Sequence, residues 1–307
     1  IAACVMDSVA YKNVVVNGLV LDENGEKMSK SKGNTVDPFA TIDKHGADIV
    51  RWTMMSTSPP WENTRFSERG LEETSRKFFA TITNVYAFFA TYANVDGYDG
   101  AQQRIPYAER SELDRWILHE LQDTVARTTE AYDQYNPTRA ARAVEAFVDS
   151  LSNWYIRRSR RRFWSSRGAD QTDTDKQAAY DTVAETLLGV AQMMAPIAPF
   201  FGDWLYRQVN GVLALHEASS VHLSRYPVVN NAYLDEGLGR RMRHARAISS
   251  LVLGLRNDAG VNVRQPLAGI MVVTNQAVSA ADIEAIAPIV RDEVNVHLVS
   301  TIDQSSE

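Results

Sequence analysis

A short segment near the start of the chain combines two ammonium groups with two hydroxyl groups. Such groups can neutralise a polyphosphate, above all one whose charge grows as a bond to phosphorus breaks. From the residues alone the segment is only a candidate phosphate-binding loop, because short runs of lysine and serine more often form solvated surface. The members of this Lys/Ser loop are Lys27, Met28, Ser29, Lys30 and Ser31.

The elements on either side of the Lys/Ser loop must hold it in place. Residues 13–21 are β-branched and apolar, which predicts a buried strand, and Asp22–Gly25 predicts a turn. After the loop, a helical pattern runs from about residue 41 to 56, and the prolines that follow it end the helix. Trp61 is expected as a packing anchor, and Cys4 as a small core residue.

A second candidate site is a helix rich in arginine. Residues 154–167 contain six arginines and no acid. Arginine presents a planar fork suited to phosphates, and tryptophan offers a face for a base or sugar. Helical spacing places Trp154, Arg157, Arg161 and Trp164 in one stripe. The candidate RNA-binding residues are Trp154, Arg157, Arg158, Arg161, Arg162 and Trp164.

A purely structural interpretation of the arginine helix is equally supported by the residues alone. The arginines would then pair with acids on neighbouring helices, such as Asp114, Glu120 and Asp123. Tyr155, Phe163 and at least one tryptophan would belong to the core. Only information beyond the segment itself can separate the two interpretations.

Most of the remaining chain predicts helices with short connections, which indicates an antiparallel bundle. Apolar residues recur at helical spacing over 113–132, and Asn136 before Pro137 is a helix start. Further helices are expected at 176–194 and from about 196 to 209. Beyond them, a long helix at 234–256 precedes two strands, at 269–274 and 294–300. Those strands flank a helix at about 280–291, which predicts a small α/β piece.

Bulk composition excludes several classes of site. With 32 basic and 38 acidic residues, the net charge is −6, which argues mildly against nonspecific nucleic-acid binding by the whole surface. One cysteine excludes an internal disulfide and a cysteine-cluster zinc site, and no two histidines have metal-ligand spacing, so no metal site is expected. No apolar stretch could span a bilayer. Because the chain starts at Ile1 without a methionine, we expect a piece of a longer protein.

The Lys/Ser loop matches letter for letter the KMSKS signature of class I aminoacyl-tRNA synthetases, in the strand–loop context of that family. The resemblance implies that the loop lies over ATP and that Lys27 and Lys30 stabilise pyrophosphate during adenylation of the amino acid. The second signature of the family, a histidine pair of the HIGH type, is absent from this sequence. We therefore expect the chain alone not to activate an amino acid.

The flanking segments resemble particular branches of that family. Asn17–Leu21 and Gly25–Asn34 look like both the isoleucyl and the valyl enzymes. Trp61–Glu68, Leu151–Trp164 and Val263–Leu267 look like the isoleucyl form. In this family the helical domain grips the anticodon stem-loop, which favours RNA contact by the arginine helix. Three alternatives remain: a valyl fragment, a non-catalytic RNA-binding module, or a helical protein–protein scaffold.

The resemblance implies a mainly α chain in three parts. A remnant of the Rossmann-type catalytic domain with the loop would cover 1–68, a helical anticodon-binding domain 69–230, and a C-terminal helix with a small α/β subdomain 231–307. It further implies ATP, Mg²⁺, isoleucine and the tRNA(Ile) anticodon stem-loop as ligands of the whole enzyme, a cytoplasmic location and a monomer.

Overall fold

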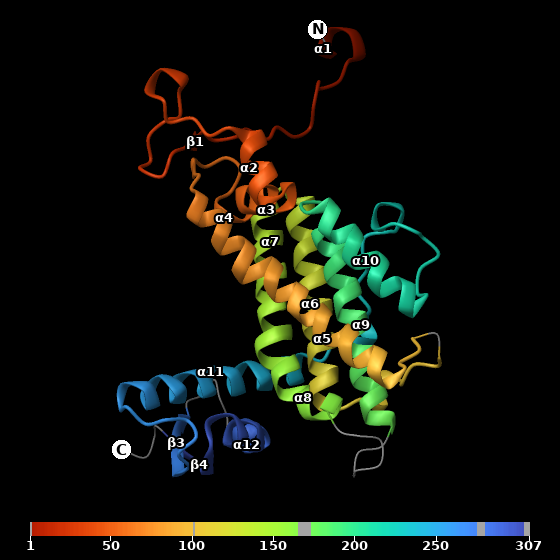
Figure 1. Cartoon of the computed structure of the whole chain (residues 1–307), viewed down its shortest axis with the longest axis vertical. Coiled ribbons are helices and arrows are strands. Elements are labelled where there is room, and N and C mark those ends of the chain that lie inside the picture. The colour runs from red at the N-terminus through yellow and green to blue at the C-terminus, as the bar shows by residue number, and fades with distance from the viewer. Residues whose placement is uncertain (1, 101, 165–172, 275–279, 304–307) are drawn as a thin grey trace. The chain divides into compact units, whose positions relative to one another are not determined.

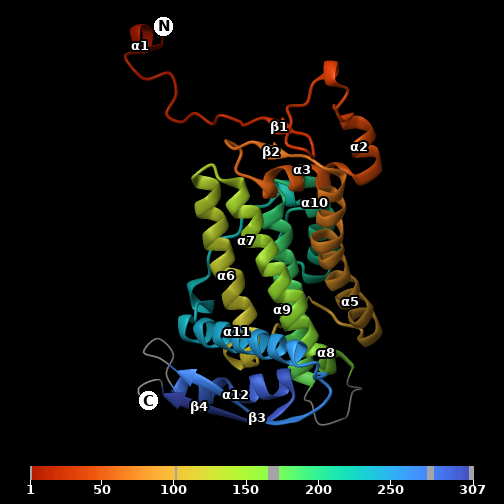
Figure 2. The same cartoon turned by 90° about the vertical axis from the view of Figure 1, so that its left-hand side faces the viewer.

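Long amphipathic helices build the first of the two compact units into which the chain divides, residues 1–233 and 234–307. The computed structural model describes residues 2–100, 102–164, 173–274 and 280–303. Helices α6, α7 and α9 run side by side in the bundle (Figures 1 and 2). The expected mainly α fold is confirmed, and the boundary expected near residue 68 stays a prediction, because both flanking segments belong to the first unit.

Capping residues start the bundle helices where the sequence predicts them. Helix α6 (Glu112–Asp133) begins with a capping box between Ser111 and Asp114. Helix α7 (Pro137–Asp149) begins at the predicted proline, and the side chain of Asn136 accepts from the third residue of the helix. Both caps satisfy amide groups that a helix leaves unpaired at its amino end. The other bundle helices are α5 (Ala80–Asp96), α9 (Asp173–Met194) and α10 (Pro199–Leu213).

The arginine helix is separated from α7 by a π-helical segment. This segment, η4 (Ser150–Ile156), continues α7 without a break and leads into α8 (Arg157–Trp164). A second π-helical segment, η2 (Ser75–Phe79), joins α4 (Glu68–Thr74) to α5. A π turn changes the rotation of the residues that follow it, so faces extrapolated from ideal helical spacing do not carry across it.

The strand expected at 13–21 is short and exposed, so its predicted burial is wrong. Only β1 (Val20–Leu21) is strand, and it pairs in parallel with β2 (Thr64–Arg65). Val14 and Val16 are 64% and 67% exposed. Within the described residues no further strand of this unit lies against β1, and an apolar segment is buried only where a partner covers it.

Three further expectations in this region need correction. Cys4 is exposed instead of buried, and Trp61 is 50% exposed instead of being a packing anchor. The helix expected at about 41–56 is two helices, α2 (Pro38–His45) and α3 (Ala47–Thr57), because Gly46 between them has a φ of 89°. The remaining short helices of the unit are α1 (Ala2–Met6), η1 (Lys30–Lys32), η3 (Tyr107–Glu109), η5 (Val221–Leu223) and η6 (Asn231–Tyr233).

Helix α3 is anchored to the bundle at its carboxyl end. The guanidinium of Arg142 donates to the carbonyls of Ser56 and Thr57 at 3.0 and 2.6 Å. The hydroxyl of Thr138 donates to the carbonyl of Met55 at 2.6 Å. These donors satisfy carbonyl groups that have no partner at the end of a helix. Helix α3 also buries Trp52 completely in the core.

The second unit is a small α/β arrangement. Strands β3 (Leu267–Thr274) and β4 (Val296–Asp303) pair in parallel, with Leu267 opposite Val296. Helix α12 (Ala280–Val294) connects them and packs on α11 (Glu236–Asp258). The predicted order of helix, strand, helix and strand is confirmed. In neither unit does any described helix combine the length and the apolar character that crossing a membrane requires.

Limited proteolysis should cut the segment before β1 first. Trypsin is expected to cleave after Lys12, in exposed extended chain, well before it cleaves after Arg127, whose side chain is also half exposed but lies on α6. Cleavage requires local unfolding, which is cheap outside packed helices. Mass spectrometry of a time course identifies the order, and equal rates at the two sites would contradict the exposed placement of residues 7–19.

Candidate functional site

A turn and a short helix give the Lys/Ser loop its shape. Residues Leu21 and Lys27 pair as an antiparallel bridge, which closes the turn at the base of the loop. The 3₁₀ turn η1 (Lys30–Lys32) then begins at Ser29, whose hydroxyl accepts from the amide of Lys32 at 3.3 Å. Gly33 ends it with a φ of 67°, a conformation that glycine adopts without strain.

The three lysines of this region differ in their contacts. The ammonium of Lys32 donates to Glu26 at 2.8 Å. Lys27 and Lys30 are exposed, and in the ranges the structure describes no acid holds their ammonium groups. The hydroxyls of Ser29 and Ser31 lie 3.2 Å apart beside them. Two unneutralised ammonium groups next to two hydroxyls can donate hydrogen bonds to a polyphosphate.

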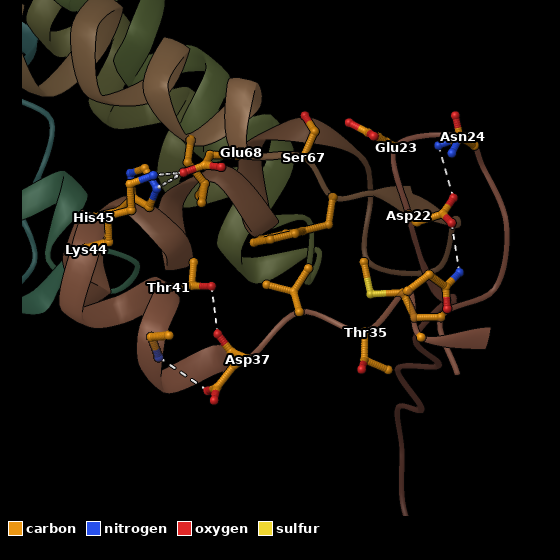
Figure 3. A pocket seen from close by; sticks show the side chains of 17 residues that line it. Asp22, Glu23, Asn24, Thr35, Asp37, Thr41, Lys44, His45, Ser67 and Glu68 are labelled. Atoms are coloured by element: carbon orange, nitrogen blue, oxygen red, sulfur yellow. Dashed lines mark hydrogen bonds and ion pairs between the residues drawn. The ribbon is translucent and has the colours of Figure 1, made fainter. Parts of the chain in front are cut away.

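A pocket of about 540 Å³ opens beside the loop, toward α2 and α4 (Figure 3). Of the five loop residues named at the outset, only Met28 lines it. Its lining carries the carboxylates of Asp22, Glu23, Asp37 and Glu68 against one ammonium group, that of Lys44, which pairs with Glu68. This excess of carboxylates would repel a polyphosphate. The pocket therefore does not suit the phosphates that the two exposed lysines suit. The described residues contain no group of three or more metal-ligating side chains that could hold a metal ion.

The arginine helix divides its side chains between the core and the surface. Arg157, Arg161 and Trp164 are exposed and Arg158 is partly exposed. Trp154 and Arg162 are 6% and 8% exposed, so both lie inside the bundle.

The predicted aromatic–arginine stripe is thus split at the π-helical segment. Trp154 packs inward, and the guanidinium carbons of Arg157 and Arg158 lie 5.8 and 5.4 Å from its ring centre. Cation–π contact at these distances places both guanidinium groups over the Trp154 ring.

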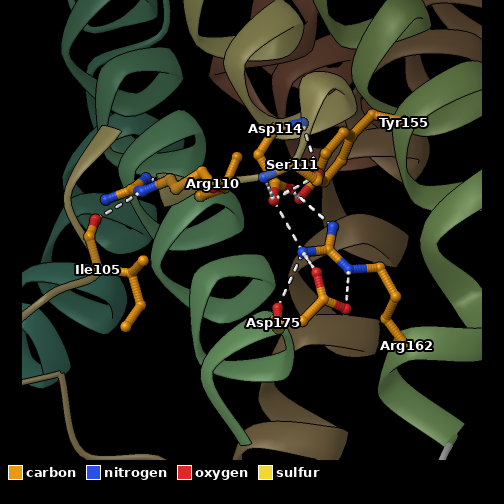
Figure 4. A network of polar contacts seen from close by, with 8 residues as sticks. Ile105, Arg110, Ser111, Asp114, Tyr155, Arg162 and Asp175 are labelled. Carbon is orange, nitrogen blue, oxygen red and sulfur yellow. Dashed lines mark hydrogen bonds and ion pairs between the residues drawn. The ribbon is translucent and has the colours of Figure 1, made fainter. Parts of the chain in front are cut away.

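Arg162 is the centre of a buried polar network (Figure 4). Two of its nitrogens donate to the two oxygens of Asp114, each at 2.7 Å. It also donates to the carboxylate of Asp175 at 2.8 and 3.0 Å. Tyr155 and Ser111 donate to Asp114 from the other side, at 2.5 and 2.7 Å. For Arg162 the structural interpretation, pairing with Asp114, is confirmed, and its donors are occupied.

Burial and pairing act in opposite directions on Asp114, which is 0% exposed. Burial by itself would raise the pKa of Asp114, but the hydrogen bonds and positive charge of Arg162 outweigh it and hold the pKa below its ordinary value. For the same reason the pKa of Arg162 is raised, although burial opposes its charge. Both groups are therefore ionised at neutral pH, as a bidentate pair.

Arg160 is a surface arginine that the sequence analysis did not select. It is exposed together with Arg157, Arg161 and Trp164, and these four positions follow the spacing i, i+3, i+4 and i+7 of one helix face. We call this set the arginine face. The sequence does contain the information that places Arg160 on this face, because the same spacing rule selects Arg160 when the face is started at Arg157 instead of Trp154.

Comparison with known proteins matches two segments of the chain to protein families. The model of the family described as the anticodon-binding domain of tRNA ligase matches residues 114–272, more than half of the chain. The chain belongs to that family. A second family model, tRNA synthetases class I (I, L, M and V), matches residues 1–67, which include the Lys/Ser loop. The resemblance to class I aminoacyl-tRNA synthetases is confirmed.

Individual relatives of the chain are isoleucine–tRNA ligases. The ligase of Cytophaga hutchinsonii is 47% identical over 307 residues, which are 100% of this chain and 27% of that protein. The ligase of Thermus thermophilus is 40% identical over 301 residues, 98% of this chain and 28% of that protein. The isoleucyl resemblance is thus confirmed along the whole chain, and the chain spans about a quarter of the length of these curated relatives.

A solved structure supports the fold alone. The ternary complex of the Agrobacterium radiobacter K84 agnB2 LeuRS with tRNA and LeuAMS superposes with a TM-score of 0.54 at 15% identity. The match covers 94% of this chain and 32% of that chain.

Removing Arg162 from its buried pair with Asp114 should strongly destabilise the folded chain. Arg162→Met leaves the carboxylate of Asp114 buried without its bidentate partner, which should lower the free energy of unfolding by about 3–5 kcal/mol. Arg160→Ala, on the same helix but exposed, should change it by less than about 0.5 kcal/mol. Urea denaturation followed by circular dichroism measures both, and equal effects would refute the distinction between the two arginines.

The same pair predicts a pH dependence. Because the folded-state pKa of Asp114 is lowered, its contribution to stability is fully present above the unfolded pKa of about 3.9 and is lost as pH falls through the lower folded pKa. The difference in free energy of unfolding between the native chain and Asp114→Asn should stay constant above that range and shrink below it. Arg162 and Asp175 are the charged groups of this network. A difference that grows on acidification would contradict the lowered pKa.

Proposed function

We propose that this chain supplies the anticodon-binding and pyrophosphate-binding parts of an isoleucine–tRNA ligase. The whole ligase would attach isoleucine to tRNA(Ile), in line with the names of its relatives, isoleucine–tRNA ligases. The class I resemblance implies that it would use ATP. The observation that carries the proposal is the arginine face, which lies inside the region that matches the anticodon-binding family. Because this sequence lacks a histidine pair of the HIGH type, we expect the chain to bind RNA without activating isoleucine alone.

The arginine face suits the backbone of an RNA stem-loop. The guanidinium groups of Arg157, Arg160 and Arg161 lie on two neighbouring turns of α8, where they can approach phosphates, although Arg157 also donates to the carbonyl of Asn153 at 2.8 Å. Trp164, which is 57% exposed, offers a stacking surface for a base. Arg158, partly exposed beside Trp154, lies at the margin of this surface. We leave Trp154 and Arg162 out of the RNA contact, because the first is buried and the second is fully engaged by carboxylates.

The Lys/Ser loop is proposed to act on ATP. Lys27 and Lys30 would stabilise the pyrophosphate as it leaves, with Ser29 and Ser31 as supporting donors and the main chain of Met28 in the same loop. Charge stabilisation of this kind acts where negative charge develops in the transition state. Mg²⁺ would enter with ATP, because it prefers phosphate oxygens and water to a cage of protein ligands. We further propose a monomer that works in the cytoplasm.

Binding of the purified chain to the anticodon stem-loop of tRNA(Ile) tests the proposal. We expect tighter binding than to the stem-loop of tRNA(Val), and a logarithm of the association constant that falls linearly with the logarithm of salt concentration. Each phosphate contact that is removed should flatten that slope by about 0.7–0.9, so Arg161→Ala should flatten it. Fluorescence anisotropy with labelled RNA measures both quantities.

The control is Arg69→Ala, which removes an arginine of α4 whose side chain is 88% exposed. This variant should bind like the native chain. Absence of binding at low salt, or equal losses in the two variants, would show that the arginine face is not the RNA contact.

A further inference from the structure

The residue that follows the Lys/Ser loop and its glycine has a side chain that spans the loop. The amide nitrogen of Asn34 donates to the carboxylate of Asp22 at 2.8 Å and to the carbonyl of Lys27 at 3.4 Å. Its amide oxygen accepts from the backbone amide of Ser29 at 2.9 Å. The side chain of Asn34 therefore connects the turn before the loop, at Asp22, with Lys27 and Ser29 inside it.

Asp22 holds the opposite end of this arrangement. One of its oxygens accepts from the backbone amides of Asn24 and Glu26, at 3.0 and 2.8 Å, which fixes the turn. The other oxygen accepts from Asn34. The hydrogen bond from Asn34 is the largest of several influences that lower the pKa of Asp22, so the carboxylate is ionised at neutral pH.

We propose that Asp22 and Asn34 form a clasp that fixes the shape of the Lys/Ser loop and thereby positions Lys27 and Lys30 for a pyrophosphate group. The inference rests on the proposed action of the loop on ATP, and it adds two positioning residues that themselves need not touch the ligand. The clasp acts on the backbone beside each lysine. The carbonyl of Lys27 is one of the groups that Asn34 contacts, and Ser29, whose amide Asn34 holds, starts the turn that contains Lys30.

Fixing the backbone while leaving the ammonium groups exposed has a physical advantage. A loop that is ordered before the ligand arrives does not lose its conformational freedom on binding, so more of the electrostatic attraction appears as affinity. Lys32, directly after the loop, reinforces the same shape through its ion pair with Glu26. Lys27 and Lys30 make no such pair in the described residues and stay available for an anion.

The polarity of the clasp makes it testable by exchange of its two side chains. In Asn34→Asp two carboxylates face each other, and in Asp22→Asn two amide nitrogens do, so each single variant should open the loop. In the double variant D22N/N34D, the side chain at 22 can accept from the turn amides and donate to the carboxylate at 34, which still accepts from Ser29. Only the long contact with the carbonyl of Lys27 is lost. The net charge of the double variant equals that of the native chain.

Amide hydrogen exchange of Ser29 and Lys32 in the full chain reports on the closed loop. Each single variant should exchange about tenfold faster, as expected for the loss of one charge-assisted hydrogen bond, and the double variant should recover most of the protection. Asn24→Ala is the matched control, because only the backbone of Asn24 contacts Asp22. Unchanged exchange in both single variants, or no recovery in the double variant, would overturn the clasp.

Acetylation of Lys27 and Lys30, with and without inorganic pyrophosphate, tests the purpose of the clasp. We expect pyrophosphate to slow acetylation of both lysines in the native chain and in the double variant, and to slow it several-fold less in Asn34→Asp and Asp22→Asn. Equal protection in the native chain and the single variants would reject the positioning role of the clasp but not the binding of pyrophosphate by the loop. No protection in the native chain would reject the pyrophosphate role of the loop, and with it the purpose of the clasp.

Discussion

The buried pair of Asp114 and Arg162 determines which face of α8 points away from the core. Removing a carboxylate and a guanidinium from water costs several kcal/mol for each ion, and only a bidentate geometry with further hydrogen bonds offsets that cost. The pair has both, since Tyr155, Ser111 and Asp175 complete it. It ties the beginning of α6, the last turns of α8 and the start of α9 into one arrangement, and in doing so it fixes the rotation of α8.

The sequence predicted helices more reliably than it predicted burial. Capping residues and apolar spacing mark α6 and α7 locally, and both helices begin within a residue of the predicted start. The exposed run before β1 shows the limit, because its apolar residues satisfy the pattern of a core strand whether or not a partner covers them. Burial of a strand depends on segments elsewhere in the chain, and no local pattern encodes it.

The candidate sites also depend on features that local sequence patterns do not encode. Five residues of the loop match a family signature, but the roles of Asp22 and Asn34 depend on hydrogen bonds between residues that are twelve positions apart in the sequence. In the arginine helix, composition indicated a cationic surface but not which arginine is internal. The π-helical segment shifts the stripe expected from Trp154, so Arg160 faces outward and Trp154 inward. A regular helical repeat contains no information about such a shift.

A chain with more acids than bases can present two cationic surfaces because some of its carboxylates are used as internal supports. Asp114 neutralises one arginine of α8 and orients the helix, which leaves three other arginines exposed on it. Asp22 is used in a similar way, since it accepts from the turn and from Asn34 while Lys27 and Lys30 extend outward. In both places the lowered pKa of the aspartate reflects the same cause, donors that converge on a fixed negative charge. The net charge of −6 therefore says little about binding, because an anion at the surface meets the exposed arginines of α8 or the two lysines of the loop, whose positions depend on Asp114 and Asp22.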